Sequence, residues 1–287
     1  MRRWAAALAG ALVLALSGCS DLPGGVDGDL TNGWSGPPAA RQFRPAAAQC
    51  HPNLVERGTL EEYAPVACGG PHLAETAVIA DLPDLPAAAR AGRAFRECSE
   101  RVTPFLGGDW RTGWLVLQPV LPSPEAWRGG ARWYRCDLAE ASPVDGELVR
   151  RTSSLKGSLK GTGKVRMSCA NPKIAGERVT EMRPVACATR HTAEFAGIFV
   201  SKRASAAGLT PAELEKGCHK VIATFAGLPA DSSVRHRVGW LGFPPDDASW
   251  QLGDHAIRCF LWLNGEPMTG SYKKAGTRKL KIHYVYR

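Results

Sequence analysis

Two short stretches place a histidine three positions before a glutamate, a pair of side chains that could act as acid and base. The stretches are 68–75 and 187–194, and both read Cys-x-x-x-His-x-Ala-Glu. Residues three apart on a strand point to opposite faces, so the two side chains of each stretch would not meet. We therefore expect structural use, with ligand contact as the alternative, and we assign no catalytic residue. The four possible ligand contacts are His72, Glu75, His191 and Glu194.

The cysteines fall into two sets of four with matched spacing, which indicates a tandem repeat. The separations are 18, 30 and 38 residues in the first set, and 18, 31 and 41 in the second. Four cysteines permit three pairings, and sequence alone does not select one. We favour bonds between neighbours: Cys50–Cys68, Cys98–Cys136, Cys169–Cys187 and Cys218–Cys259. Zinc is the competing hypothesis, but structural zinc sites use closer cysteine pairs, so we expect no metal and no cofactor.

The N-terminus reads as a targeting segment, because two arginines precede an apolar run of thirteen residues, 4–16. That run is shorter than the ~20 residues that span a membrane. Leu16-Ser17-Gly18-Cys19 resembles a bacterial lipobox, and Cys19 is the one cysteine without a counterpart in the two sets. We expect a signal peptide over 1–18, lipidation of Cys19 and a flexible tether over 19–49. A cleaved signal with a free cysteine is the alternative. Several acyl chains would hold the protein stably to the outer face of the cell membrane.

An exported chain meets an oxidising compartment, which favours disulfides and makes nucleic acid an improbable partner. Residues 50–140 carry 9 basic and 12 acidic side chains (9 − 12 = −3), whereas residues 166–287 carry 18 and 10 (18 − 10 = +8). The last 21 residues hold six basic side chains and no acidic one. Such a segment can attract anionic polymers, although a solvated basic surface is the commoner explanation.

The elements repeat in the same order in the two copies, which we place at 50–162 and 163–287. Each copy is predicted to be strand, strand, helix, strand, strand. This order predicts an α+β fold of two tandem repeats, each a small, mostly antiparallel sheet with one packed helix, held by disulfides. In the first copy we expect strands at 63–68, 73–80, 114–120 and 133–138, a helix at 86–102 and a loop at 122–131. In the second we expect strands at 179–187, 194–200, 238–243, 257–263 and 279–286, and a helix from the N-cap Thr210 to Gly227.

Smaller signals complete the alignment of the copies. Trp240 is predicted to match Trp114, and Trp250 to match Trp127. Residues 264–265 (Asn-Gly) are typical of a hairpin turn. The segment 152–161 resembles 269–276, which marks it as the tail of the first copy.

This pattern resembles the septum-formation domain of actinobacterial surface proteins. Both copies carry Pro-Val-x-Cys, a histidine and glutamate, a helix cysteine, a tryptophan before a loop, and Arg-Cys on the last strand. The matching residues are 65–68, His72, Glu75, Cys98, Trp127 and 135–136, then 184–187, His191, Glu194, Cys218, Trp250 and 258–259. The second copy departs in having Arg190 where the first has Pro71. The resemblance implies a membrane-anchored extracytoplasmic protein linked to cell division, with no assigned reaction.

We therefore expect a non-enzymatic lipoprotein that binds a partner in the cell envelope, either a cell-wall polymer or a division protein. One alternative is an anionic-polymer binder that uses Lys273, Lys274, Arg278, Lys279 and Lys281. The other is an envelope hydrolase that uses His72 or His191.

Overall fold

The computed structural model of the protein describes residues 43–59, 62–176 and 178–283. The predicted signal peptide, the predicted lipidation site Cys19 and most of the predicted tether lie outside the described residues. Both predicted copies belong to one compact unit that begins at Phe43. We call them the first half, up to residue 162, and the second half, from residue 163.

The first half is a five-stranded sheet with the order β1-β3-β5-β4-β2. All neighbouring strands are antiparallel except β2 and β4. Its elements are β1 (Gln49–His51), β2 (Arg57–Gly58), β3 (Ala74–Asp81), α2 (Ala87–Arg101), α3 (Thr103–Leu106), the 3-10 turn η1 (Trp110–Thr112), β4 (Leu115–Pro122), α4 (Pro124–Arg128) and β5 (Trp133–Glu140).

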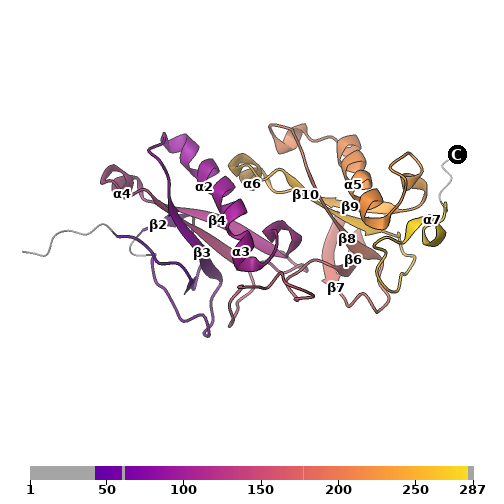
Figure 1. The fold of residues 1–287 in the computed structure, drawn as a ribbon, viewed down its shortest axis with the longest axis horizontal. Helices are drawn as coiled ribbons and strands as arrows, with labels where there is room; N and C mark the ends of the chain where they lie inside the picture. Colours follow the sequence, from indigo (N-terminus) through magenta and orange to yellow (C-terminus); the bar gives the residue numbers. More distant parts are fainter. Residues whose placement is uncertain (1–42, 60–61, 177, 284–287) are drawn as a thin grey trace, which may run out of the picture. The chain divides into compact units, whose positions relative to one another are not determined.

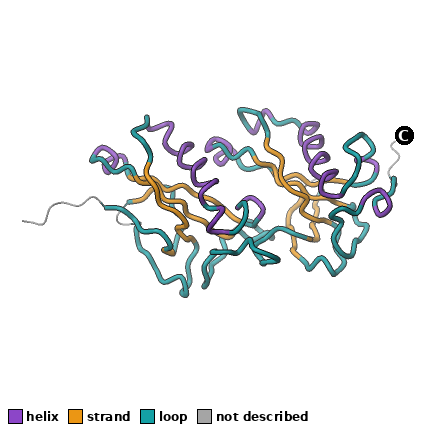
Figure 2. Tube along the Cα trace, in the orientation of Figure 1, coloured by secondary structure: helices purple, strands orange, loops and turns teal. Residues whose placement is uncertain are grey.

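The second half is an antiparallel five-stranded sheet with the order β7-β6-β8-β10-β9. Its elements are β6 (Cys169–Ala175), β7 (Arg178–Pro184), β8 (Ala193–Val200), η2 (Ala206–Gly208), α5 (Pro211–Ala226), η3 (Val234–His236), β9 (Gly239–Phe243), α6 (Asp247–Leu252), β10 (Ala256–Trp262) and α7 (Gly276–Lys279). In each half one long helix packs on the sheet, α2 against β4 and β5, and α5 against β8, β9 and β10 (Figure 1). Figure 2 shows the same pairing of long helix and strands in both halves. The α+β fold with two sheet-and-helix halves is confirmed.

The helix α5 forms where the sequence predicted it, because both of its ends carry strong signals. The Thr210 hydroxyl accepts from the Glu213 amide and the Glu213 carboxylate accepts from the Thr210 amide, which satisfies two otherwise unpaired donors. Gly227 ends the helix in the left-handed conformation at φ 67°, which glycine adopts at no steric cost. The buried face then presents Cys218 and Ile222 to the sheet.

The predicted strand at 63–68 is wrong, because within it only Val66 makes a single bridge, to Cys50. The first strand is β1, which surrounds Cys50 and pairs with β3. The predicted loop at 122–131 contains the short helix α4, which Ser123 caps through the Ala126 amide. Its Trp127 is buried.

Two predictions for the C-terminal region are also wrong within the described residues. Residues 279–283 form no strand, since Lys279 ends α7, and 284–286 lie outside the described range. The Asn-Gly pair makes a turn that leads only to an isolated bridge between Met268 and His191. The strand registers also correct the tryptophan alignment. Pro119 lies opposite Cys136 and Gly242 opposite Cys259, so Trp240 corresponds to Leu117 rather than to Trp114.

The connection between the halves is hydrogen-bonded to the first half. The Trp114 amide donates to the Val165 carbonyl at 2.8 Å, and the Met167 amide donates to the Thr112 carbonyl at 2.9 Å. The Trp114 ring stacks on Phe260 of β10, with centroids 6.1 Å apart. The first residues of the second predicted copy therefore pack against the first half.

Candidate functional site

The four disulfides join the cysteines in the predicted pairs, 50–68, 98–136, 169–187 and 218–259. Cys98 and Cys218 lie on the buried faces of α2 and α5, and their partners lie on β5 and β10. One bridge in each half therefore ties the long helix to the sheet. A glutamate lies beside the other bridge, Glu75 near Cys50–Cys68 and Glu194 near Cys169–Cys187. Within each group the two cysteine sulfurs form a disulfide, so neither group offers the thiolates that zinc requires.

The first His-Glu stretch holds the tail of its half against β3. The His72 backbone exchanges hydrogen bonds with Arg151 at 2.9 and 2.8 Å, and its Nδ1 lies 2.8 Å from the Gly70 carbonyl oxygen. The Glu75 carboxylate accepts from the Ser154 hydroxyl and from the Leu155 amide, both at 2.6 Å. We call this arrangement the tail clasp.

The second stretch builds the same clasp. His191 pairs with the Met268 backbone at 3.0 and 2.7 Å, and its Nδ1 lies 2.7 Å from the Thr189 carbonyl oxygen. The Glu194 carboxylate accepts from the Ser271 hydroxyl at 2.5 Å and from the Tyr272 amide at 2.7 Å. The likeness of 152–161 to 269–276 thus has a structural cause, because each segment supplies the serine and the amide that the glutamate binds.

Burial leaves the clasp residues little contact with solvent. His72, Glu75, His191 and Glu194 are 1%, 2%, 0% and 5% exposed. Carbonyl oxygens only accept, so Nδ1 carries the proton in both histidines and is engaged. These contacts favour a structural role for both stretches.

A buried polar network in the first half was not foreseen from the sequence. The Thr76 hydroxyl donates to Asp137 at 2.7 Å and lies 3.0 Å from Nε2 of His51. Nε of Arg135 lies 3.0 Å from Asp137 Oδ2, in an ion pair that lacks the alignment of a hydrogen bond. Burial raises the pKa of Asp137 to about 6 although Arg135 opposes the shift. Burial, and secondarily the Arg135 charge, lowers the pKa of His51 to about 4.

The second half replaces this network with apolar side chains. The matched cysteines and strand registers relate the positions of the two halves. His51, Thr76 and Asp137 correspond to Ala170, Phe195 and Phe260, respectively. They pack together with partly buried Trp114. No spacing pattern in the sequence could reveal the network, because its members come from three separate strands.

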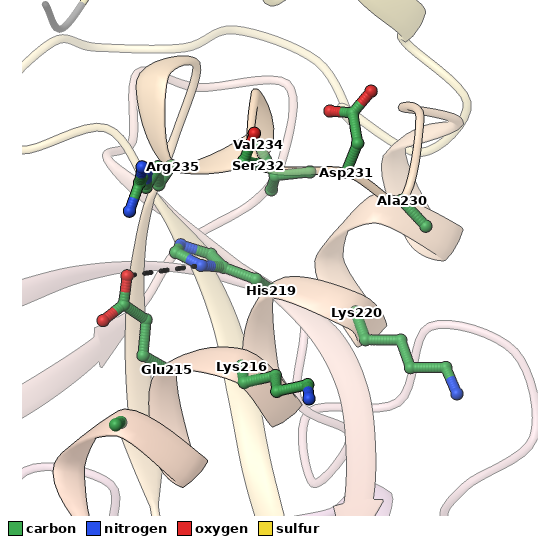
Figure 3. A pocket seen from close by; sticks show the side chains of 10 residues that line it. Glu215, Lys216, His219, Lys220, Ala230, Asp231, Ser232, Val234 and Arg235 are labelled. Carbon is green, nitrogen blue, oxygen red and sulfur yellow. Dashed lines mark ion pairs between the residues drawn. The ribbon is translucent and has the colours of Figure 1, made fainter.

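The candidate ligand site is a pocket of about 550 Å³ on the second half, between α5 and η3. We call it the α5–η3 pocket, and its charged lining residues are Glu215, Lys216, His219, Lys220, Asp231 and Arg235. Figure 3 shows Glu215, Lys216, His219 and Lys220 on the helix, with Asp231 and Arg235 on the segment that faces it.

His219 lies at the inner side of this pocket. Its Nδ1 is 3.7 Å from Glu215 Oε1 (Figure 3). Its ring meets Trp240 of β9 edge to face, with centroids 6.4 Å apart. Burial lowers the pKa of His219, against the attraction of Glu215. A partly buried neutral imidazole among cations and carboxylates can exchange hydrogen bonds with a polar ligand.

The predicted basic segment contacts the C-terminal end of α5 and the last residue of η3. Lys273, Lys274, Arg278, Lys279 and Lys281 are all exposed. The Lys274 amide donates to the Phe225 carbonyl at the end of α5, at 2.9 Å. The His283 amide donates to the His236 carbonyl of η3, also at 2.9 Å. These bonds bring the segment beside the elements that line the α5–η3 pocket.

The fold and the bridges define a disulfide-stabilised α+β protein made of two similar halves. The chain matches the family described as septum formation over residues 47–259, and it belongs to this family. The match begins before β1 and ends in β10, so it spans both halves as one region. Membership associates the chain with septum formation, a cell-division process of the cell envelope. Comparison with curated proteins and with solved structures gives no match.

Within the described ranges, none of the helices combines the length and the apolar character needed to span a bilayer.

Proposed function

We propose that the protein is a non-enzymatic extracytoplasmic lipoprotein that holds a partner at the cell envelope during septum formation. The tail clasps are the observation that supports a non-enzymatic role. The histidines and glutamates with the most enzyme-like spacing are buried and bind the protein's own backbone and serines. The disulfides support a rigid module suited to an oxidising compartment.

Lipidation of Cys19 would fix this module to the outer face of the cell membrane. The lipobox and the absence of a matching cysteine support this assignment. Replacement Cys19→Ala should move the chain from the membrane fraction to the medium and abolish incorporation of labelled palmitate. Membrane retention and unchanged labelling in this variant would refute the anchor.

A hydrolase should release soluble fragments from purified cell-wall sacculi. We expect the purified chain to release none above a buffer control when products are separated by chromatography. Release by the wild type that is lost in His72→Gln and His191→Gln variants with native circular dichroism would replace the binding proposal with an enzymatic one.

Binding of an anionic cell-wall polymer is the second candidate, and the exposed basic segment favours it. The expected ligand carries repeated phosphates, which can be tested with polyglycerol phosphate. Affinity should fall steeply with salt, because exposed charges are screened within about 10 Å at 0.1 M ionic strength. Lys273→Glu should weaken binding more than Arg128→Glu, a control on exposed α4. Equal effects or salt-indifferent binding would remove this candidate.

A further inference from the structure

In the first half, the space between α2 and η1 is occupied by an aspartate of the second half. Nη2 of Arg111 on η1 lies 3.4 Å from the Ser99 hydroxyl of α2. Nε of the same arginine donates to Oδ1 of Asp254 at 2.9 Å. The Asp254 side chain is only 5% exposed, so this carboxylate is inserted into the first half.

A second residue of the inserted segment contacts the backbone of the first half. Arg258 donates from Nε to the Arg111 carbonyl at 3.1 Å and from Nη2 to the Leu115 carbonyl, at the start of β4, at 3.3 Å. One segment thus presents an acid to η1 and, four positions later, a base to carbonyls of η1 and β4.

The α5–η3 pocket is the corresponding spot of the second half. Cys98 and Cys218 are matched by their disulfides, so His219 corresponds to Ser99. Arg111 and Arg235 are each the second residue of a 3-10 turn whose first residue is buried and which precedes the matched strand. Arg235 also lies close enough to affect the charge of His219. No ion pair among the described residues involves Arg235, which donates from Nε to the His236 ring at 3.4 Å.

The neighbouring strand edge also differs between the halves. In the first half β4 carries Pro119, and β2 covers its end at Leu121 and Pro122. In the second half β9 is the outermost described strand of its sheet and reads Gly-Trp-Leu-Gly-Phe. Proline and charged side chains are the usual means of blocking an edge, and β9 has neither. An edge of this kind accepts an extended segment of another protein.

We propose that the α5–η3 pocket docks a segment of a partner protein that presents a carboxylate to Arg235 and runs beside β9. The proposal deepens the binding function above and rests on it. The partner segment would imitate Asp254 and Arg258, with an acid and a base four positions apart. The pocket suits such a mixed segment, because Glu215 and Asp231 accompany its cations and would repel a uniform polyanion.

The partner is a different protein rather than a second copy of this chain. The first half has Ala131 at the position of Asp254, four residues after the matched tryptophan, and its Arg135 is 1% exposed. The first half of a second copy therefore has no acid at the first position and only a buried base at the second. Asp254 of the second half is already bound to Arg111.

The probe is a labelled peptide of residues 249–258, Ser-Trp-Gln-Leu-Gly-Asp-His-Ala-Ile-Arg, which carries Asp254 and Arg258. Fluorescence anisotropy would measure its binding to the full, oxidised chain. We expect saturable binding that Arg235→Glu weakens at least tenfold and that Arg128→Glu, the same charge change on exposed α4, weakens less than twofold. A peptide with Asp254→Lys should recover affinity for the Arg235→Glu chain. Native circular dichroism of both variants establishes that they fold.

Absence of saturable binding would overturn the proposal, as would equal losses in the two variants or unchanged binding of an Asp254→Asn peptide. Dependence of polyglycerol phosphate binding on Arg235, without peptide binding, would assign the pocket to a polymer instead. Self-association in sedimentation that Arg235→Glu abolishes would assign it to a second copy. Because the assay uses purified components, it can succeed even if no partner is held at the septum.

Discussion

Arg111 and Asp254 lie 143 positions apart and form a charge-assisted hydrogen bond of 2.9 Å that joins the two halves. The carboxylate is 5% exposed and the guanidinium 19%. A hydrogen bond between charged groups is about twice as strong as one between neutral groups. The same guanidinium stacks over Trp110, 4.8 Å from its ring centroid. Packing of the halves therefore depends on a specific contact as well as on the covalent connection.

Removing one partner of this pair should destabilise the protein. Arg111→Ala removes the charge-assisted hydrogen bond of the buried Asp254 carboxylate, which should lower the free energy of unfolding by about 3 kcal/mol. Arg128→Ala removes an exposed pair with Glu125, whose side chains are 76% and 70% exposed. That control should leave the urea midpoint almost unchanged, because an exposed ion pair contributes little to stability. Urea unfolding followed by tryptophan fluorescence compares the two, and equal midpoints would contradict the role given to Arg111.

The tail clasps should respond to loss of their carboxylates. Glu75→Ala leaves the buried Leu155 amide without its acceptor, which should cost about 1.5–3 kcal/mol, as for other hydrogen bonds to charged groups. Hydrogen exchange of the Leu155 amide should accelerate. Glu194→Ala should do the same at Tyr272 while leaving Leu155 protected. Unchanged exchange at either amide would show that the clasp does not hold the tail.

The buried network should give opposite pH responses from its two titrating groups. The pKa of His51 falls from 6.5 to about 4 on folding, so its contribution is full above pH 6.5 and is lost as the pH falls toward 4. The pKa of Asp137 rises from 3.8 to about 6, so its contribution is full below pH 3.8 and is lost as the pH rises toward 6. Between pH 4 and 6 the two groups change the free energy of unfolding in opposite directions, so their pH dependences cancel in the wild type.

A substitution that removes one group should reveal the pH dependence that the other group gives to the free energy of unfolding. In Asp137→Asn the free energy of unfolding should fall as the pH is lowered from 6.5 to 4, whereas in His51→Gln it should fall as the pH is raised from 4 to 6. A shift of two pKa units corresponds to about 3 kcal/mol, which urea titrations at fixed pH can resolve. Parallel pH profiles in the two variants would contradict these assignments.

The preference for bonds between neighbouring cysteines and the positions of the long helices are confirmed, although cysteine spacing alone permits three pairings in each set. Matched spacing identified the cysteine sets, and placing Cys218 on the buried stripe of α5 made its bond to Cys259 the natural pairing. The start of the second long helix was equally clear, because Thr210 and Glu213 form a local capping signal. Predictions that rest on local chemistry were thus the most accurate.

Short and tertiary features were harder to predict. The strand β1 has three residues and no alternating pattern, and it exists because it pairs with β3 beside the Cys50–Cys68 bridge. The α4 signal, Ser123 followed by Pro124, was present but too short to distinguish from a turn. The α5–η3 pocket joins His219 to Arg235 across sixteen positions without any motif, and only the structural match to Ser99 and Arg111 identifies it.

Loss of a disulfide between a long helix and the sheet should lower the free energy of unfolding while the strand order of the sheet is kept. Replacement of Cys218 and Cys259 by alanine opens a loop of 41 residues, which the chain-entropy account values at about 4 kcal/mol. The Cys169–Cys187 bridge, with a separation of 18, should contribute about 3 kcal/mol. Urea unfolding of the two alanine pairs measures the difference, and a stability equal to that of the wild type in either would contradict the account.

Localisation in dividing cells tests the central claim most directly. A fluorescent fusion of the wild type should concentrate at the septum, and the Cys19→Ala fusion should be absent from the membrane. Arg235→Glu should remain on the membrane but spread evenly, while Arg128→Glu should still concentrate at the septum. Septal enrichment of the Arg235→Glu fusion equal to that of the wild type would contradict a scaffold that holds its partner through the second half.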